Sequence, residues 1–136
     1  MRTLGIDYGG KRVGIAISDE NNAFALPLAV LPNDRRLVAS VKKIATEKTV
    51  GTIVLGESRN FKGEPNAIMK DIEKFKDELE KETRLKVEYE PEFLTSAEAA
   101  RVQGKTKMHD ASAAALILKS YLDKQANQGT IQLNHG

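Results

Sequence analysis

Three carboxylates stand where the apolar pattern of the chain does not call for an acid. Asp7 ends the apolar run LGI, Glu92 follows Pro91 just past a predicted strand, and Asp110 begins a predicted helix. In α/β sheets, functional sites gather at the carboxyl ends of strands, so Asp7 and Glu92 come close together if their strands lie near the sheet centre. The helix that begins at Asp110 can then bring a third carboxylate across.

Crowded carboxylates repel one another, and bound divalent cations relieve that repulsion. Two Mg²⁺ ions about 3.5–4 Å apart suit in-line phosphoryl chemistry, in which one ion activates water and the other stabilises the leaving oxygen. Hard oxygen ligands in a chain without cysteine favour Mg²⁺ or Mn²⁺ over Zn²⁺. The sequence therefore predicts a divalent-metal site whose candidate ligands are Asp7, Glu92 and Asp110.

Each acid also has a purely structural interpretation. Asp110 can be a helix N-cap, because Asp is among the best residues for that position. Glu92 can be an ordinary exposed loop acid, and Asp7 can cap a turn. Asp7 is the hardest of the three to explain in this way, since an ordinary strand would bury an apolar residue there.

Three groups of basic residues border the same predicted strand ends. The first follows the turn Gly9–Gly10, the second lies in the loop GESRNFKG, and the third lies in the acid-free stretch RVQGKTKMH. Such an arrangement matches a phosphate-backbone footprint, and the glycines let backbone approach phosphate closely; the alternative is an ordinary solvated surface. The candidate nucleic-acid-binding residues are Lys11, Arg12, Arg59, Lys62, Arg101, Lys105 and Lys107.

Composition narrows the class of protein. The 136 residues make one ordinary domain, and an apolar fraction of 40% can build a core. A net charge of +2 is too small to argue for a polyanionic partner by itself, and the absence of cysteine excludes disulfides and thiol catalysis. Asp7 interrupts the first apolar run too early for a signal peptide, and no apolar stretch approaches the ~20 residues of a membrane span. We therefore expect a cytoplasmic, single-domain protein.

Hydrophobic periodicity predicts strands at 3–7, 12–18, near 23–30, at 52–55 and at 85–90. Helices are expected from Asn33 or Asp34, from Pro65, over 95–104, and from near Asp110. The order predicts an α/β fold with a mixed five-stranded sheet, antiparallel in strands one to three and parallel in four and five, with helices on both faces. Residues 127–136 are expected to form a loose polar tail, with a short edge strand at Ile131 and Leu133 as the alternative.

Four motifs, in this order and at these spacings, resemble the YqgF (RuvX) family of Holliday-junction-resolvase-like and pre-16S rRNA processing nucleases. They are GIDYGGKRVGIAISD at 5–19, the VLG loop at 54–63, PEFLTSAEA at 91–99 and DASAAALILKSYLD at 110–123. The resemblance spans nearly the whole chain and implies a ribonuclease H-like fold. By position, Asp7, Glu92 and Asp110 resemble the three acidic active-site residues of the family, and Lys11 and Arg12 match its basic pair.

The chain departs from the family pattern at two places. Gly56-Glu57-Ser58 stands where the family usually reads GLP, and Phe93 stands where Arg is common. Glu57 can either join the metal site or face solvent.

The resemblance implies a metal-dependent endonuclease that matures the 5′ end of pre-16S rRNA. One alternative is a Holliday-junction resolvase with the same chemistry, which should dimerise because a junction has twofold symmetry. A second is a non-catalytic RNA-binding ribosome-assembly factor. The opening also resembles the phosphate loop of the actin/Hsp70/sugar-kinase superfamily, but a lone domain lacks the second phosphate-binding half, and no GxxxxGK[ST] sequence is present. Nothing in the sequence fixes the oligomeric state.

Overall fold

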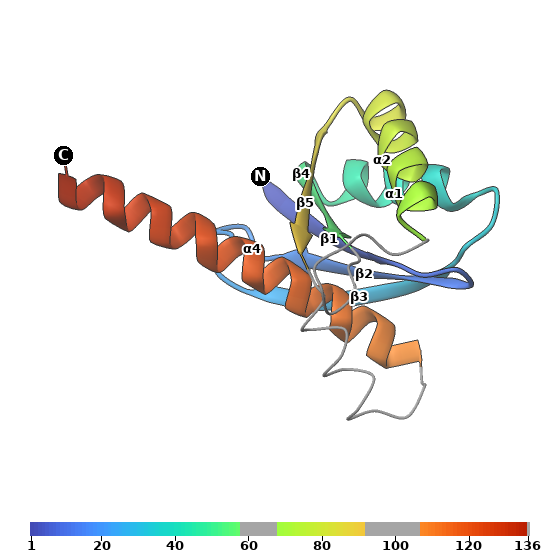
Figure 1. Ribbon diagram of the computed structural model, residues 1–136, viewed down its shortest axis with the longest axis horizontal. Helices are drawn as coiled ribbons and strands as arrows, with labels where there is room; N and C mark the ends of the chain where they lie inside the picture. Colours follow the sequence, from blue (N-terminus) through green and yellow to red (C-terminus); the bar gives the residue numbers. More distant parts are fainter. Residues whose placement is uncertain (58–67, 92–106, 136) are drawn as a thin grey trace.

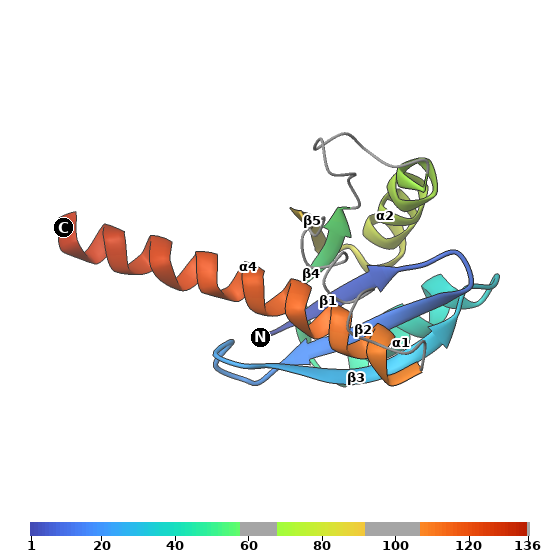
Figure 2. The ribbon, with the colours of Figure 1, turned by 60° about the horizontal axis from the view of Figure 1, so that its bottom comes forward.

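The computed structural model describes residues 1–57, 68–91 and 107–135, with side chains described at 1–57, 68–90 and 111–126. A five-stranded sheet in the order β3-β2-β1-β4-β5 carries α1 and α2 on one face and α4 on the other (Figures 1 and 2). The elements are β1 (Arg2–Tyr8), β2 (Arg12–Ser18), β3 (Ala25–Pro32), α1 (Leu37–Glu47), β4 (Val50–Glu57), α2 (Met69–Thr83), β5 (Lys86–Pro91) and α4 (Lys107–His135).

The pairing of the strands confirms the predicted mixed sheet. β1 with β2 and β2 with β3 are antiparallel, whereas β1 with β4 and β4 with β5 are parallel. The condition for Asp7 and Glu92 to come close together, that strands one and five both lie near the centre, is not met by β5, which is an edge strand separated from β1 by β4. The reason is burial: Ile53, Val54 and Leu55 make β4 apolar on both faces, as suits an inner strand, while β5 alternates apolar and charged residues.

The sheet separates two apolar cores. On one face, side chains of β1, β2, β4 and β5 pack against α1 and α2, with Leu37, Val41, Ile72, Phe75 and Leu79 as buried helix residues. On the other face, Ala16 and Val54 pack against Ala114, Ile117, Leu118 and Leu122 of α4. Because side chains alternate along a strand, successive residues of β2 and β4 pack in different cores.

Gly5 lets α4 approach β1 closely. A Cβ atom added at Gly5 would lie 2.8 Å from the Leu118 Cβ and 3.0 Å from the Ala114 carbonyl oxygen. Both distances are too short for a side chain, so the helix rests directly on the backbone of the central strand. This contact fixes the height of α4 above the sheet.

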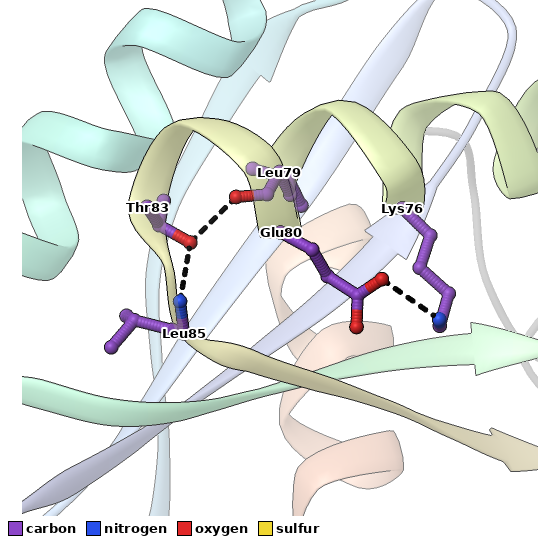
Figure 3. Close-up of polar contacts among 5 residues, drawn as sticks. All are labelled: Lys76, Leu79, Glu80, Thr83 and Leu85. Carbon is purple, nitrogen blue, oxygen red and sulfur yellow. Dashed lines mark hydrogen bonds and ion pairs between the residues drawn. The ribbon is translucent and has the colours of Figure 1, made fainter.

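The end of α2 directs the chain into β5 (Figure 3). The Thr83 hydroxyl donates to the Leu79 carbonyl at 2.6 Å and accepts from the Leu85 N–H at 3.2 Å. Arg84 takes a left-handed conformation with φ 59°, which turns the chain out of the helix. On the side of the same helix that faces β5, Lys76 and Glu80 form an ion pair at 3.1 Å, and the Lys76 Nζ lies 5.7 Å from the centre of the Tyr89 ring.

The predicted start of the first helix is wrong. α1 begins at Leu37, and its N-cap Arg36 receives no side-chain capping hydrogen bond. Asn33 instead donates its side-chain amide to the Gly9 carbonyl at 2.8 Å, and the Asp34 Oδ1 accepts from the Arg36 N–H at 2.9 Å. Neither side chain therefore caps α1: Asn33 bonds to the β1–β2 turn, and Asp34 bonds to the backbone just before the helix.

The last helix is longer at both ends than the sequence predicts. α4 begins at Lys107, so Asp110 lies within its first turn and is not the N-cap. It continues to His135, so residues 127–135 are helical, and the short edge strand proposed at Ile131 and Leu133 does not form. The predicted helix at 95–104 lies outside the described residues. Among the helices that the structure describes, none combines the length and apolarity that a membrane crossing requires.

Candidate active site

Asp7 lies near the carboxyl end of the central strand, on the face that α4 covers. Its neighbours Ile6 and Tyr8 pack on the α1–α2 side, and Gly5 lies against α4. Alternation along the strand therefore places the Asp7 side chain on the α4 side. The residue is half-buried, and β1 is paired on both sides, so the backbone at this position is held rigidly.

Glycines flank Asp7 on the two adjacent strands. Gly14 of β2 is its direct antiparallel partner. On the other side, Gly56 stands one residue beyond the last β1–β4 pair, Ile6 with Leu55, and so lies level with Asp7. No side chain from β2 or β4 stands beside the carboxylate at this level.

The same level of the sheet continues to β5, where Gly56 pairs with Glu90. With neighbouring strands about 4.8 Å apart, β1 and β5 are about 10 Å apart at this level. The described part of β5 ends at Pro91, and Glu92 lies outside the described residues.

The first turn of α4 reaches the end of the sheet that carries Asp7. Ala114, one helical turn after Asp110, rests on Gly5, which is two residues before Asp7. Figures 1 and 2 both show α4 beginning at the end of the sheet where β1 ends and running back across the sheet. The backbone at position 110 is therefore brought to the Asp7 end of the covered face; the Asp110 side chain is outside the described set.

The basic candidates divide into described and undescribed residues. Lys11 is exposed and Arg12 is half-buried, and both follow the β1–β2 turn just beyond Asp7. Arg59, Lys62, Arg101 and Lys105 lie outside the described residues, as does the side chain of Lys107. Among the described side chains, no three His, Asp or Glu residues gather as metal ligands, a set that does not include Glu92 or Asp110.

The two glycines of the β1–β2 turn, Gly9 and Gly10, differ in how much space surrounds them. A Cβ atom at Gly9 would lie 2.5 Å from the Arg12 carbonyl oxygen, so the tight turn requires glycine there. At Gly10, no described heavy atom lies within 4 Å of such a Cβ atom. Gly10 is exposed and leaves open backbone beside Lys11.

Glu57 lies on the opposite face from Asp7. Val54 belongs to the α4 core and Leu55 to the α1–α2 core, so alternation along β4 directs Glu57 to the α1–α2 side. In agreement, the pKa of Tyr89 on that side is raised by burial and by nearby carboxylates, Glu73 first and then Glu57. Of the two interpretations of Glu57, the arrangement does not support a place beside Asp7.

A polar cluster between β5 and α4 was not found from the sequence. Glu90 is only 3% exposed, and its Oε2 accepts from the Ser120 hydroxyl at 2.7 Å and pairs with the Lys124 Nζ at 2.8 Å. The Tyr121 hydroxyl donates to Glu88, and burial together with this hydrogen bond raises the pKa of Tyr121 to about 12. Alternation in the sequence indicates that Glu88 and Glu90 share a face, but not that a helix covers it.

Comparison with known proteins gives consistent results. The RuvX family model, described as "Holliday junction resolvase", matches residues 1–124. Curated relatives named "Putative pre-16S rRNA nuclease" include one from Caldanaerobacter subterraneus, 31% identical over 93% of this chain and 99% of the relative. Another, from Anaeromyxobacter sp., is 36% identical over 90% of this chain and 97% of the relative.

Two groups of solved structures share the fold. RuvC of T. thermophilus in complex with a Holliday junction substrate superposes with a TM-score of 0.61 at 15% identity, covering 93% of this chain and 96% of that chain. Fowlpox virus resolvase with Holliday junction DNA gives 0.59 at 16% identity, covering 92% and 99%. These likenesses confirm the predicted ribonuclease H-like fold.

Proposed function

This chain belongs to the RuvX family of nucleases, and we propose that it is a metal-dependent endonuclease that processes the 5′ end of pre-16S rRNA. In this proposal one cytoplasmic domain binds the RNA and hydrolyses a phosphodiester bond. The observation that carries the proposal is the position of Asp7, a half-buried carboxylate at the end of the central strand with the first turn of α4 at the same end. The names of the curated relatives supply the substrate.

The surroundings of Asp7 fit a hard divalent cation. A carboxylate oxygen is the donor type that Mg²⁺ and Mn²⁺ prefer, and the glycines at 14 and 56 put no side chain beside it. In the proposal, Asp7, Glu92 and Asp110 hold two such ions. When bound, these ions activate water and stabilise charge on the leaving oxygen.

Residues of the chain itself position the metal ligand Asp7 and neutralise the phosphates of the substrate. The sheet holds Asp7 in one orientation, and Lys11 and Arg12 neutralise phosphates next to it, together with the other basic candidates. Attack of water on phosphorus leaves a 5′-phosphate and a 3′-hydroxyl. Because contacts to phosphate carry no sequence information, specificity then rests on RNA shape or on the assembling ribosome.

Resolution of Holliday junctions is the second candidate. The family description and the fold shared with resolvases bound to junction DNA favour it. The chemistry at Asp7 would be the same, but a resolvase should act as a dimer on a twofold-symmetric junction. A non-catalytic RNA-binding assembly factor is the third candidate, and it requires no function of Asp7.

A cleavage assay distinguishes these candidates. A 5′-extended pre-16S rRNA fragment and a four-way DNA junction are incubated with Mg²⁺ or Mn²⁺ and with wild type, Asp7→Asn or Asp19→Asn. We expect metal-dependent RNA cleavage that falls more than about 100-fold in Asp7→Asn, since even outer partners of metal ligands are typically worth 10- to 100-fold. Asp19 makes the matched control, because its carboxylate accepts from Ala23 and Phe24 N–H groups in a distant exposed turn.

The other outcomes of the assay support another candidate function or contradict the role of Asp7. Symmetric cutting of the junction, with RNA left intact, supports the resolvase. Binding of RNA that is equal in wild type and Asp7→Asn, without cutting of either substrate, supports the assembly factor. Full cleavage by Asp7→Asn contradicts the proposed role of this residue.

A further inference from the structure

The β1–β2 turn is joined to the connection between β3 and α1. The Asn33 N–H donates to the Lys11 carbonyl at 2.9 Å, and the Asn33 side chain donates to the Gly9 carbonyl at 2.8 Å. Arg12 pairs with Pro32 in the β2–β3 ladder. Residues 33–36 are therefore held against the turn that follows Asp7, although they are far from it in sequence.

Three exposed cations lie on the two segments of this junction. Lys11, Arg35 and Arg36 are exposed, and within the described residues no carboxylate lies within ion-pair distance of any of the three. The acid of the connection, Asp34, is directed to backbone, since its Oδ1 accepts the Arg36 N–H. Two segments that are joined by hydrogen bonds, beyond the end of β1 that carries Asp7, thus both bear exposed cations.

Gly10 adds open backbone to the same place. Neither packing nor conformation requires glycine there, because its surroundings within the described residues are empty to 4 Å and its φ is not in the left-handed region. A residue without a side chain, next to exposed cations, lets a flat or extended polyanion approach the main chain. The open position is consistent with a contact made by something outside the protein.

Acidic residues limit the extent of this surface. Arg35 also borders a cavity of about 240 Å³ between α1 and α2, which Lys74 and the three acids Asp34, Asp71 and Glu78 line as well. The three carboxylates lower the positive potential inside the cavity. The positive surface is therefore the part outside the cavity, toward the turn.

We propose that Gly10, Lys11, Arg35 and Arg36, here called the turn–helix surface, bind the phosphate backbone of the nucleic acid on the approach to Asp7. The inference rests on the proposed function and adds to it Arg35 and Arg36, which none of the four motifs includes, beside Gly10 and Lys11 of the first motif. Guanidinium groups bind phosphate oxygens through two parallel hydrogen bonds, and Lys11 supplies a point charge. The chemistry is common to RNA and DNA, so both kinds of strand should use the surface.

The test compares two double variants with the same loss of charge on the same segment of the chain. Arg35→Gln/Arg36→Gln removes charge from the turn–helix surface, and Lys42→Gln/Lys43→Gln removes it from exposed positions about 10 Å further along α1. Affinity for the pre-16S rRNA fragment and for the four-way DNA junction is measured without divalent metal over a range of salt concentrations. Gly10→Val is measured alongside, with melting temperatures for all variants.

We expect the salt slope of log K for single-stranded RNA to fall by about 1.4 in Arg35→Gln/Arg36→Gln, since each phosphate contact contributes about 0.7. The affinity at low salt should fall about 10-fold on RNA and on DNA, with KM raised and kcat kept. Gly10→Val should bind several-fold more weakly with an unchanged melting temperature. The Lys42→Gln/Lys43→Gln control should keep both slope and affinity.

Equal losses in the two double variants, or an unchanged slope in Arg35→Gln/Arg36→Gln, would overturn the inference while leaving the proposed nuclease intact. A wild type that binds neither RNA nor junction DNA overturns the inference and the proposed function together. Loss confined to RNA or to DNA contradicts contact through phosphate alone and overturns the inference as stated.

Discussion

Asp7 is flanked on both neighbouring strands by glycine, a residue that destabilises strands. Gly14 and Gly56 flank it on either side of β1, and glycine in a strand costs roughly 0.5–1 kcal/mol relative to alanine. Two such positions beside one half-buried carboxylate weaken the sheet at its centre. The absence of β2 and β4 side chains at this level fits the proposed binding of a metal ion at Asp7.

Tyr121 supplies a prediction about alkaline pH. Burial and the hydrogen bond to Glu88 raise its pKa from 10.0 to about 12. The unfolded chain therefore loses this proton first, so the contribution of Tyr121 to stability is complete below pH 10 and is lost as the pH rises toward about 12. We expect the free energy of unfolding, measured with urea, to fall across this window.

The control for this prediction is Tyr121→Phe, which has no hydroxyl to titrate. Its stability should fall less steeply over the same range, with the remaining slope partly due to Tyr89, whose pKa is also raised. Absorbance titration of tyrosinate should lose its highest-pH step in the variant. Parallel stability curves for the two proteins would contradict the assignment.

At the scale of elements, two contacts of different kinds position α4 in addition to its apolar core. The Gly5 contact sets its distance from β1, and the polar cluster around Glu90 sets its position along β5. A helix free to slide would carry Asp110 away from the end of β1. The cluster thus affects the candidate site, although Ser120, Tyr121 and Lys124 lie about three to four turns beyond Asp110 in the helix.

Lys124→Met tests how strongly the cluster holds the helix. The variant leaves the Glu90 carboxylate buried without its cation, which should lower the free energy of unfolding by about 1–3 kcal/mol. Lys119→Met makes the matched control on the same helix, because its partner Asp123 is exposed and such pairs are worth about 0–1 kcal/mol. Urea denaturation measures both.

The double variant Lys124→Met/Glu90→Gln separates the charge from the packing. It removes the unpaired charge and keeps a group that accepts from Ser120, so it should recover part of the loss. Equal stabilities of Lys124→Met and Lys119→Met would show that the cluster does not fix α4.

The sequence predicts the helices and strands better than it predicts which of them lie next to each other in the fold. Period-two alternation predicts the strands, and the stripe of Ile72, Phe75 and Leu79 predicts α2, because these patterns depend on local geometry. The edge position of β5 and the late start of α1 depend on contacts between distant residues. Asn33 is a good N-cap by type, but Gly9 takes its amide, and no local pattern reveals that.

The same distinction applies to the candidate site. Asp7 is conspicuous in the sequence because an acid interrupts an apolar run. Arg35 and Arg36 look like ordinary exposed residues, since their position beside the turn comes from the hydrogen bonds of Asn33. Glu90 looks like a solvated strand residue, since the helix that buries it is remote in sequence.

At the scale of the whole molecule, we expect the backbone of the sheet to be best protected from solvent at its centre and least protected at β3. β1 is paired on both sides and covered on both faces. The edge strand β3 leaves Leu26 53% exposed, next to Phe24 at 68%, and Pro27 and Pro32 provide no N–H groups for further pairing. The prolines limit addition of another strand at this apolar edge.

Amide hydrogen exchange tests this gradient. The amides of β1 and β4 should exchange only through global unfolding, whereas those of β3 should also exchange through local opening, at least about 10-fold faster. Exchange followed by mass spectrometry or NMR under native conditions measures both. Equal rates in β1 and β3 would mean that the sheet opens as one unit.

The position of α4 across β1 also has a consequence for how the protein is made. β1 is translated early and α4 late, yet the two lie against each other in the finished sheet. Until α4 has emerged, the nascent sheet exposes Ala16 and Val54, and position 110 has not been brought to the Asp7 end of the sheet. If the site works as proposed, a growing chain cannot cut RNA until α4 has been translated and has packed on the sheet.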